Sequence, residues 1–88
     1  MEVTSCEFIR AKNSRKQEKQ IAYGGDDNPL NYRNLPLKDL WKRFDETYNT
    51  VCSQADEEHP PFEKTKKELV DLSNFCEFLW IRLNMIPF

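Results

Sequence analysis

The sequence is poor in several residue types that common classes of small protein require. It has two glycines, one histidine and three cysteines among 88 residues. The glycine pair lacks a following Lys-Ser or Lys-Thr pair, so it does not form a phosphate-binding loop, and the scattered cysteines do not form a disulfide scaffold. His59 is followed by two prolines in an acidic loop and lacks the orienting partner of a general base. We therefore expect no enzymatic activity and no cofactor.

Metal-binding and membrane-spanning patterns are also absent from the sequence. Structural zinc sites pair their ligands a few residues apart, and no two of Cys6, Cys52, Cys76 and His59 are so spaced. Cys52 and Cys76 lie on apolar helix stripes and are predicted to be buried thiols. No run approaches the roughly 18 apolar residues of a membrane span, and no stretch resembles a signal peptide. We expect an intracellular protein, cytoplasmic or nuclear, that contacts no membrane and takes no small-molecule substrate.

Charge is divided unevenly along the chain, although the net value is only −2. Residues 1–44 hold nine Lys and Arg against six Asp and Glu, whereas residues 45–88 hold four against nine. A basic amino-terminal half and an acidic carboxyl-terminal half attract one another or recruit partners of opposite sign.

The first 34 residues are predicted to form a basic, partly ordered arm and a linker. Residues 3–9 are a candidate short strand or ordered stretch, and the Gly-Gly-Asp-Asn-Pro-rich segment 24–29 favours turns. The arm is solvated in the simplest interpretation; a nuclear-import address or weak contact with nucleic-acid phosphates are the alternatives. Its cations are Arg10, Lys12, Arg15, Lys16 and Lys19.

Two amphipathic helices are predicted in the remaining domain, residues 35–88. The first covers about 35–54, with Asn34 as a candidate N-cap, and the second covers about 62–85, after Pro60 and Pro61. Apolar residues recur at spacings of three and four in both helices. The main stripe of the second helix comprises Phe62, Leu69, Leu72, Cys76, Leu79, Trp80 and Leu83, with seven-residue steps through Phe62, Leu69, Cys76 and Leu83. This main stripe is predicted to pack against the first helix.

The carboxyl-terminal half of the second helix is apolar nearly all round. Phe78 and Met85 project almost opposite the main stripe, and Ile81 flanks them. A pair of helices can cover only one stripe of each member, and burial of one such side chain contributes about 1.5–3 kcal/mol. We therefore expect this surface to be covered, by a partner chain in the favoured interpretation or by the chain's own arm in the other.

These patterns together predict an all-α fold, an antiparallel helical hairpin completed as a bundle by a partner chain, with a homodimer as the first candidate. The predicted function is non-enzymatic protein–protein interaction, as an adaptor, accessory protein or assembly subunit. The alternative is a nuclear or nucleic-acid-associated factor that acts through residues 10–19. A small enzyme or ligand carrier is a third class and would require a closed pocket between the helices. The predicted partner-binding residues are Trp41, Phe75, Phe78, Trp80, Ile81 and Met85.

Overall fold

The fold was analysed in a computed structural model that describes residues 5–24, 28–29 and 31–85. The described chain forms three helices, α1 (Ser5–Tyr23), α2 (Leu37–Ala55) and α3 (Phe62–Asn84), and no strand. The predicted all-α class is confirmed. The predicted division of the chain at residue 34 stays a prediction.

The predicted strand at residues 3–9 is wrong over its described part, because α1 begins at Ser5. Residues 3 and 4 lie outside the described residues. From Ser5 to Tyr23 the chain contains no glycine or proline and is rich in Ala, Arg, Lys, Gln and Glu, which are good helix formers. The basic segment is therefore a helix, although it lacks an apolar stripe.

Helices α2 and α3 agree with the predicted ranges to within two residues at each end. The start of α2 differs in its cap, because Pro36, with φ −54° and ψ 140°, occupies the N-cap position. The Asn34 side chain, the predicted cap, instead donates a hydrogen bond of 2.8 Å to the carbonyl oxygen of Asn28. The prolines before Phe62 end the loop that precedes α3, as expected.

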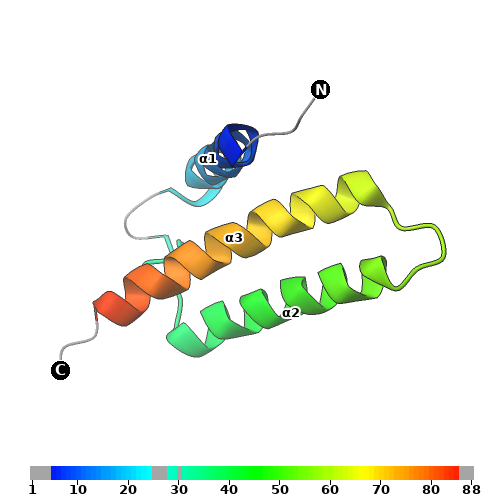
Figure 1. Ribbon diagram of the computed structural model, residues 1–88. Coiled ribbons are helices and arrows are strands. Elements are labelled where there is room, and N and C mark those ends of the chain that lie inside the picture. The colour runs from blue at the N-terminus through cyan, green and yellow to red at the C-terminus, as the bar shows by residue number, and fades with distance from the viewer. Residues whose placement is uncertain (1–4, 25–27, 30, 86–88) are drawn as a thin grey trace.

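The three helices are arranged around α3. In Figure 1, α2 and α3 lie side by side and run in opposite directions, and α1 lies on the other side of α3. No Cα atom of α1 comes within 8 Å of one in α2. The segment that joins α1 to α2 passes behind α3 in this view. Helix α3 therefore lies against both of the other helices, whose backbones are farther from each other.

The hydrophobic core is small for a chain of this length. Only Leu35, Leu40 and Leu79 are buried apolar side chains among the described residues, and Leu40 alone is fully enclosed. Five partly buried side chains pack around them: Tyr32, Leu37, Phe44, Phe75 and Phe78. Small domains bury a low fraction of their surface and are correspondingly marginal. The described monomer therefore depends on few buried contacts.

Candidate functional site

Helices α2 and α3 together present two different faces. At about 100° per residue, Leu69, Cys76 and Trp80 lie about 60–100° round α3 from buried Leu79. On α2, Trp41 and Tyr48 lie about 80–100° from buried Leu40 in the same rotational sense. Because the helices run in opposite directions, equal rotations lead to the same side of the pair (Figure 1). These apolar side chains therefore share one face.

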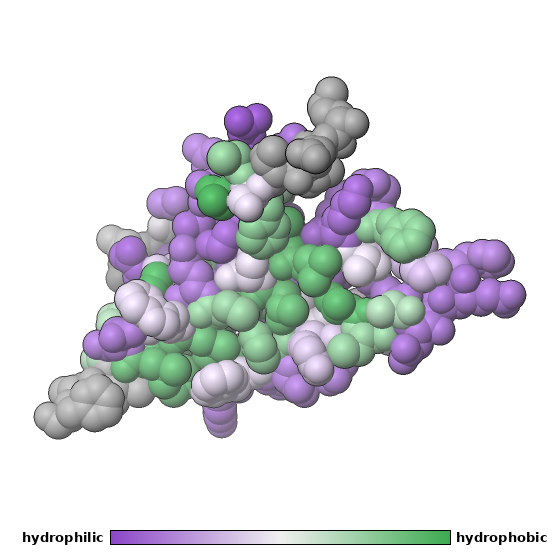
Figure 2. Space-filling view, in the orientation of Figure 1, coloured by the Kyte–Doolittle hydropathy of each residue, from purple (hydrophilic) through white to green (hydrophobic). Residues whose placement is uncertain are grey.

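We call this surface the apolar face. Its large side chains are substantially exposed, from 41% for Leu83 to 69% for Phe62. Figure 2 shows apolar side chains gathered over α2 and α3 on the side turned towards the viewer. Its members are Trp41, Tyr48, Cys52, Phe62, Leu69, Cys76, Trp80 and Leu83.

The main stripe of α3 packs only in part, whereas the sequence-based expectation was that all of it packs. Leu79 is buried and Leu72 partly so, but Leu69, Trp80 and Leu83 are exposed. The predicted burial of Cys52 and Cys76 is also wrong, since both thiols are exposed. Helix α2 contacts α3 along an arc centred near Leu79, and this leaves one edge of the stripe uncovered.

The predicted partner-binding residues fall into two groups. Trp41, Trp80 and Met85 are 45%, 68% and 61% exposed, and both tryptophans lie on the apolar face. Phe75, Phe78 and Ile81 are only partly exposed and lie on the other side of α3. The two groups therefore do not form one surface.

The linker before α2 covers part of the opposite face. The rings of Tyr32 and Phe78 stack with centroids 4.1 Å apart and planes 10° from parallel. Arg82 of α3 holds the same segment, because its guanidinium donates hydrogen bonds to the carbonyl oxygens of Tyr32 and Leu35. The surface around Phe78 is thus partly covered by the chain itself, through the linker rather than through an amino-terminal strand.

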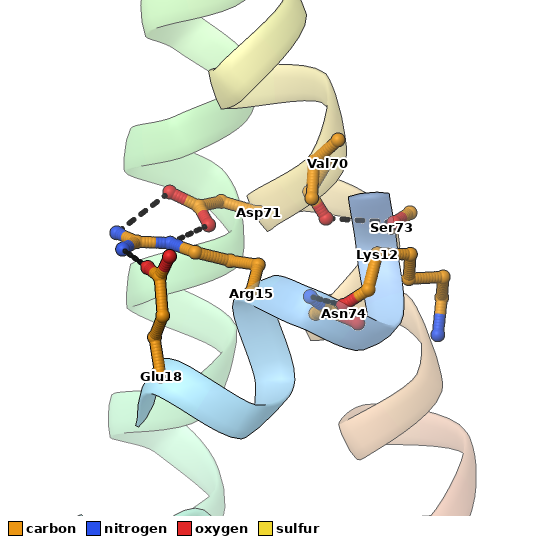
Figure 3. Close-up of polar contacts among 7 residues, drawn as sticks. All are labelled: Lys12, Arg15, Glu18, Val70, Asp71, Ser73 and Asn74. Carbon is orange, nitrogen blue, oxygen red and sulfur yellow. Dashed lines mark hydrogen bonds and ion pairs between the residues drawn. The ribbon is translucent and has the colours of Figure 1, made fainter. Parts of the chain in front are cut away.

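Helix α1 is attached to α3 mainly by charged groups. Lys12 and Lys16 both pair with Glu77, at 3.1 and 3.0 Å, and Arg15 pairs with Asp71 at 2.8 Å. Figure 3 shows Arg15 extending from α1 between Asp71 and Glu18. The expected attraction between the basic and acidic halves of the chain thus takes the form of these ion pairs.

The ion pairs shift the pKa values of two of their members. Burial acts to raise the pKa of Glu77, but hydrogen bonds from Lys16 and Lys12 outweigh burial and hold this pKa below its ordinary value. The hydrogen bond with Asp71, followed by that with Glu18, raises the pKa of Arg15. Both shifts favour the charged forms on which the contact between α1 and α3 depends.

Asn74 lies beneath α1 and is the one buried polar residue among those described, with 5% exposure. Its Nδ2 donates a hydrogen bond of 3.2 Å to the carbonyl oxygen of Lys12, as Figure 3 shows. Its Oδ1 is buried and accepts no hydrogen bond from the described residues. The polar side of α3 is therefore covered by α1 at this point.

A cavity of about 500 Å³ lies on the same side of α3 as the linker. Its lining includes Asp71, Asn74 and Phe75 of α3, Arg15 of α1 and Arg43 of α2. The cavity lies where α1 and α2 pack against α3 with their Cα atoms more than 8 Å apart.

Neither a catalytic nor a metal-binding arrangement is evident in the described chain. His59 is exposed in the loop between α2 and α3. No group of three or more His, Cys, Asp and Glu side chains among the described residues is arranged to hold a metal ion. Within residues 5–24, 28–29 and 31–85, no helix combines the length and apolar character that crossing a membrane requires.

Comparisons with known proteins give no relative from which to infer a function. The chain matches no protein-family model, no curated protein and no solved structure.

Sequence reasoning missed several members of the apolar face. Leu69 and Leu83 belong to the predicted main stripe of α3, yet they are 44% and 41% exposed, and Tyr48 of α2 is 50% exposed. The sequence did carry a signal that part of the seven-residue repeat on α3 is exposed. A second apolar stripe through Phe75 and Leu79 lies beside this repeat, and two stripes on one helix cannot both face α2.

Proposed function

We propose that this chain is a non-enzymatic protein-interaction module whose apolar face binds another protein chain. The observation that carries the proposal is the row of large apolar side chains along α2 and α3, each 41–69% exposed. Monomeric proteins rarely expose contiguous apolar patches of more than a few hundred Å², and larger patches mark interaction sites. Tryptophan and tyrosine dominate the energy of such contacts, and this face holds Trp41, Tyr48 and Trp80.

The small core supports the same proposal. Three buried apolar side chains stabilise the described monomer, whereas six large ones remain exposed on the apolar face. Burial of each of these would contribute about 1.5–3 kcal/mol. A partner chain would therefore supply apolar burial comparable to that of the intramolecular core.

The occupant that we propose is a second copy of the chain. The apolar face consists of two helices in opposite directions, with seven-residue spacing on α3 and between Trp41 and Tyr48 on α2. Two such faces related by a twofold axis would form an antiparallel helical hairpin dimer, a four-helix bundle. This bundle differs from the one predicted from sequence, because it uses Trp80 and Leu69 rather than Phe75 and Phe78. We also propose an intracellular location. The three described thiols are not in disulfides, and disulfides are rare in the reducing cytosol and nucleus.

The nucleic-acid alternative has weaker support. Lys12, Arg15 and Lys16, three of the five cations of residues 10–19, pair with carboxylates of α3. Contact with phosphates would have to compete with these ion pairs. Fewer cations are therefore available to phosphates than this alternative requires.

The test is size-exclusion chromatography with light scattering over a concentration series. We expect the parent to show the mass of two chains and Trp80→Glu the mass of one, with unchanged helical circular dichroism. The control is Ile21→Glu, at an 85% exposed position of α1 outside the apolar face, which should leave the dimer intact. A parent of single-chain mass at every concentration up to the millimolar range would refute the second copy as the occupant.

A further inference from the structure

The cavity between α1 and α2 has the shape and chemistry of a ligand site on the side of α3 opposite the apolar face. Its floor is formed by α3 residues spaced three or four apart, including Asp71, Phe75 and Phe78. Helices α1 and α2 form its walls, and the linker contributes Tyr32. Its volume of about 500 Å³ lies within the range of small-molecule sites.

The rings at the cavity make it suited to an apolar, flat molecule. Phe78 stacks on Tyr32 and meets Phe75 edge to face, with centroids 6.4 Å apart. Aromatic ligands gain from offset stacking and edge contacts with such rings in addition to burial.

Cationic side chains surround these rings. Five of the lining residues are Lys or Arg and two are acidic. Both acids are already engaged, Asp71 with Arg15 and Glu77 with two lysines. Arg43 is exposed on α2 and makes no ion pair with any described residue. The cavity therefore offers an unpaired guanidinium to an anionic group.

The buried amide of Asn74 gives an independent indication of a ligand. This side chain is 95% buried, lines the cavity, and leaves its Oδ1 without a donor among the described residues. The bond from Nδ2 to the Lys12 carbonyl oxygen fixes which amide atom is left over. Buried polar atoms in native proteins are nearly always paired, so an orphaned acceptor at a cavity indicates a missing donor.

We propose that this cavity binds an aromatic organic anion, with its ring system against Phe75 and Phe78 and its carboxylate, sulfonate or phosphate at Arg43. A hydrogen-bond donor on the ring system would satisfy Oδ1 of Asn74. This proposal does not rest on the dimer, because the cavity and the apolar face lie on opposite sides of α3. It gives the chain a ligand-binding property, which corresponds to the ligand carrier named above as a third class of function.

The test uses two fluorescent probes that share a ring system. Anilinonaphthalene sulfonate is anionic, and N-phenylnaphthylamine is its neutral counterpart. We expect the parent to bind the anionic probe saturably at one site per chain and about tenfold more tightly than the neutral one. Reversal of a charge close to a bound anion changes affinity by about tenfold even in water, so Arg43→Glu should weaken the anionic probe by that factor and leave the neutral one unchanged.

The matched control is Lys42→Glu, the same charge reversal at the preceding exposed residue, which does not line the cavity. It should change the affinity of the anionic probe by less than twofold. If Arg43→Glu and Lys42→Glu weakened binding of the anionic probe equally, the proposal would be overturned. Such a result would indicate that the probe responds only to the overall charge of the protein. Equal affinity for the two probes in the parent would also overturn it, since this result would place the probes on the apolar face. Absence of saturable binding by the anionic probe would refute the site directly.

Discussion

Replacement of Glu77 by Gln should weaken the attachment of α1 to α3 without unfolding the rest of the chain. The carboxylate of Glu77 accepts from both Lys12 and Lys16, so one substitution removes the ion pairs of both lysines and leaves the pair between Arg15 and Asp71 in place. The side chains involved are 17–34% exposed, and ion pairs of this kind contribute about 0.2–1 kcal/mol each. The attachment of α1 should therefore weaken by about 0.4–2 kcal/mol.

Amide hydrogen exchange measures this change directly. A loss of about 0.4–2 kcal/mol corresponds to roughly two- to thirtyfold faster exchange in the middle of α1, because about 1.4 kcal/mol is a factor of ten. Amides around Leu40 and Leu79 should keep their protection, since no apolar core contact is lost. The control is Glu63→Gln, which removes only an exposed pair with Lys66 within α3. Unchanged α1 exchange in Glu77→Gln, or equal loss of protection in all three helices, would refute this account of how α1 is attached.

Three further changes test the remaining contacts. The lowered pKa of Glu77 stabilises the attached state above the ordinary glutamate pKa; the protection of α1 amides, taken relative to their intrinsic exchange rates at each pH, should fall as the pH falls through the lowered value, and Glu77→Gln should abolish this step. Leu40→Ala should cost about 2–5 kcal/mol in the free energy of unfolding, measured with urea, because Leu40 is fully buried; a cost under 1 kcal/mol would contradict the assigned core. Tyr32→Ala should cost about 0.5–1.5 kcal/mol beyond the lost burial, because it removes the stack on Phe78; a urea midpoint equal to that of the parent would show that the linker contributes no stability.

Periodicity predicted α2 and α3 because their sequences carry the signals that amphipathic packing requires. The apolar repeat and the proline pair placed both helices to within two residues of their observed ends. Helix α1 was not predicted, because the residues through which it contacts α3 are charged. Lys12, Arg15 and Lys16 face α3, and apolar periodicity does not reveal a charged contact face. Its residue composition alone favoured a helix.

The assignment of faces on α3 was not determined by the sequence. Both the stripe through Leu69 and Trp80 and the surface around Phe78 are apolar, and each is wide enough to pack against a neighbour. The stack of Tyr32 on Phe78 covers the second of these surfaces. The sequence does not indicate this stack, because the position of Tyr32 depends on the path of the linker in the complete fold. The cavity likewise depends on how the three helices and the linker are arranged. Its lining residues could therefore not be grouped from their spacing along any one helix.

The attachment of α1 to α3 also has a consequence for the order of events during synthesis. Its bonds join residues that are 56 and 62 positions apart, whereas α2 and α3 are separated by one short loop. Because α1 precedes α3 in the chain, it must wait until residues 71–77 of α3 have emerged from the ribosome before it meets its binding surface. During this interval its cations stay accessible to chaperones and ribosomal RNA, and closure of the long loop comes after the local pairing of the other two helices.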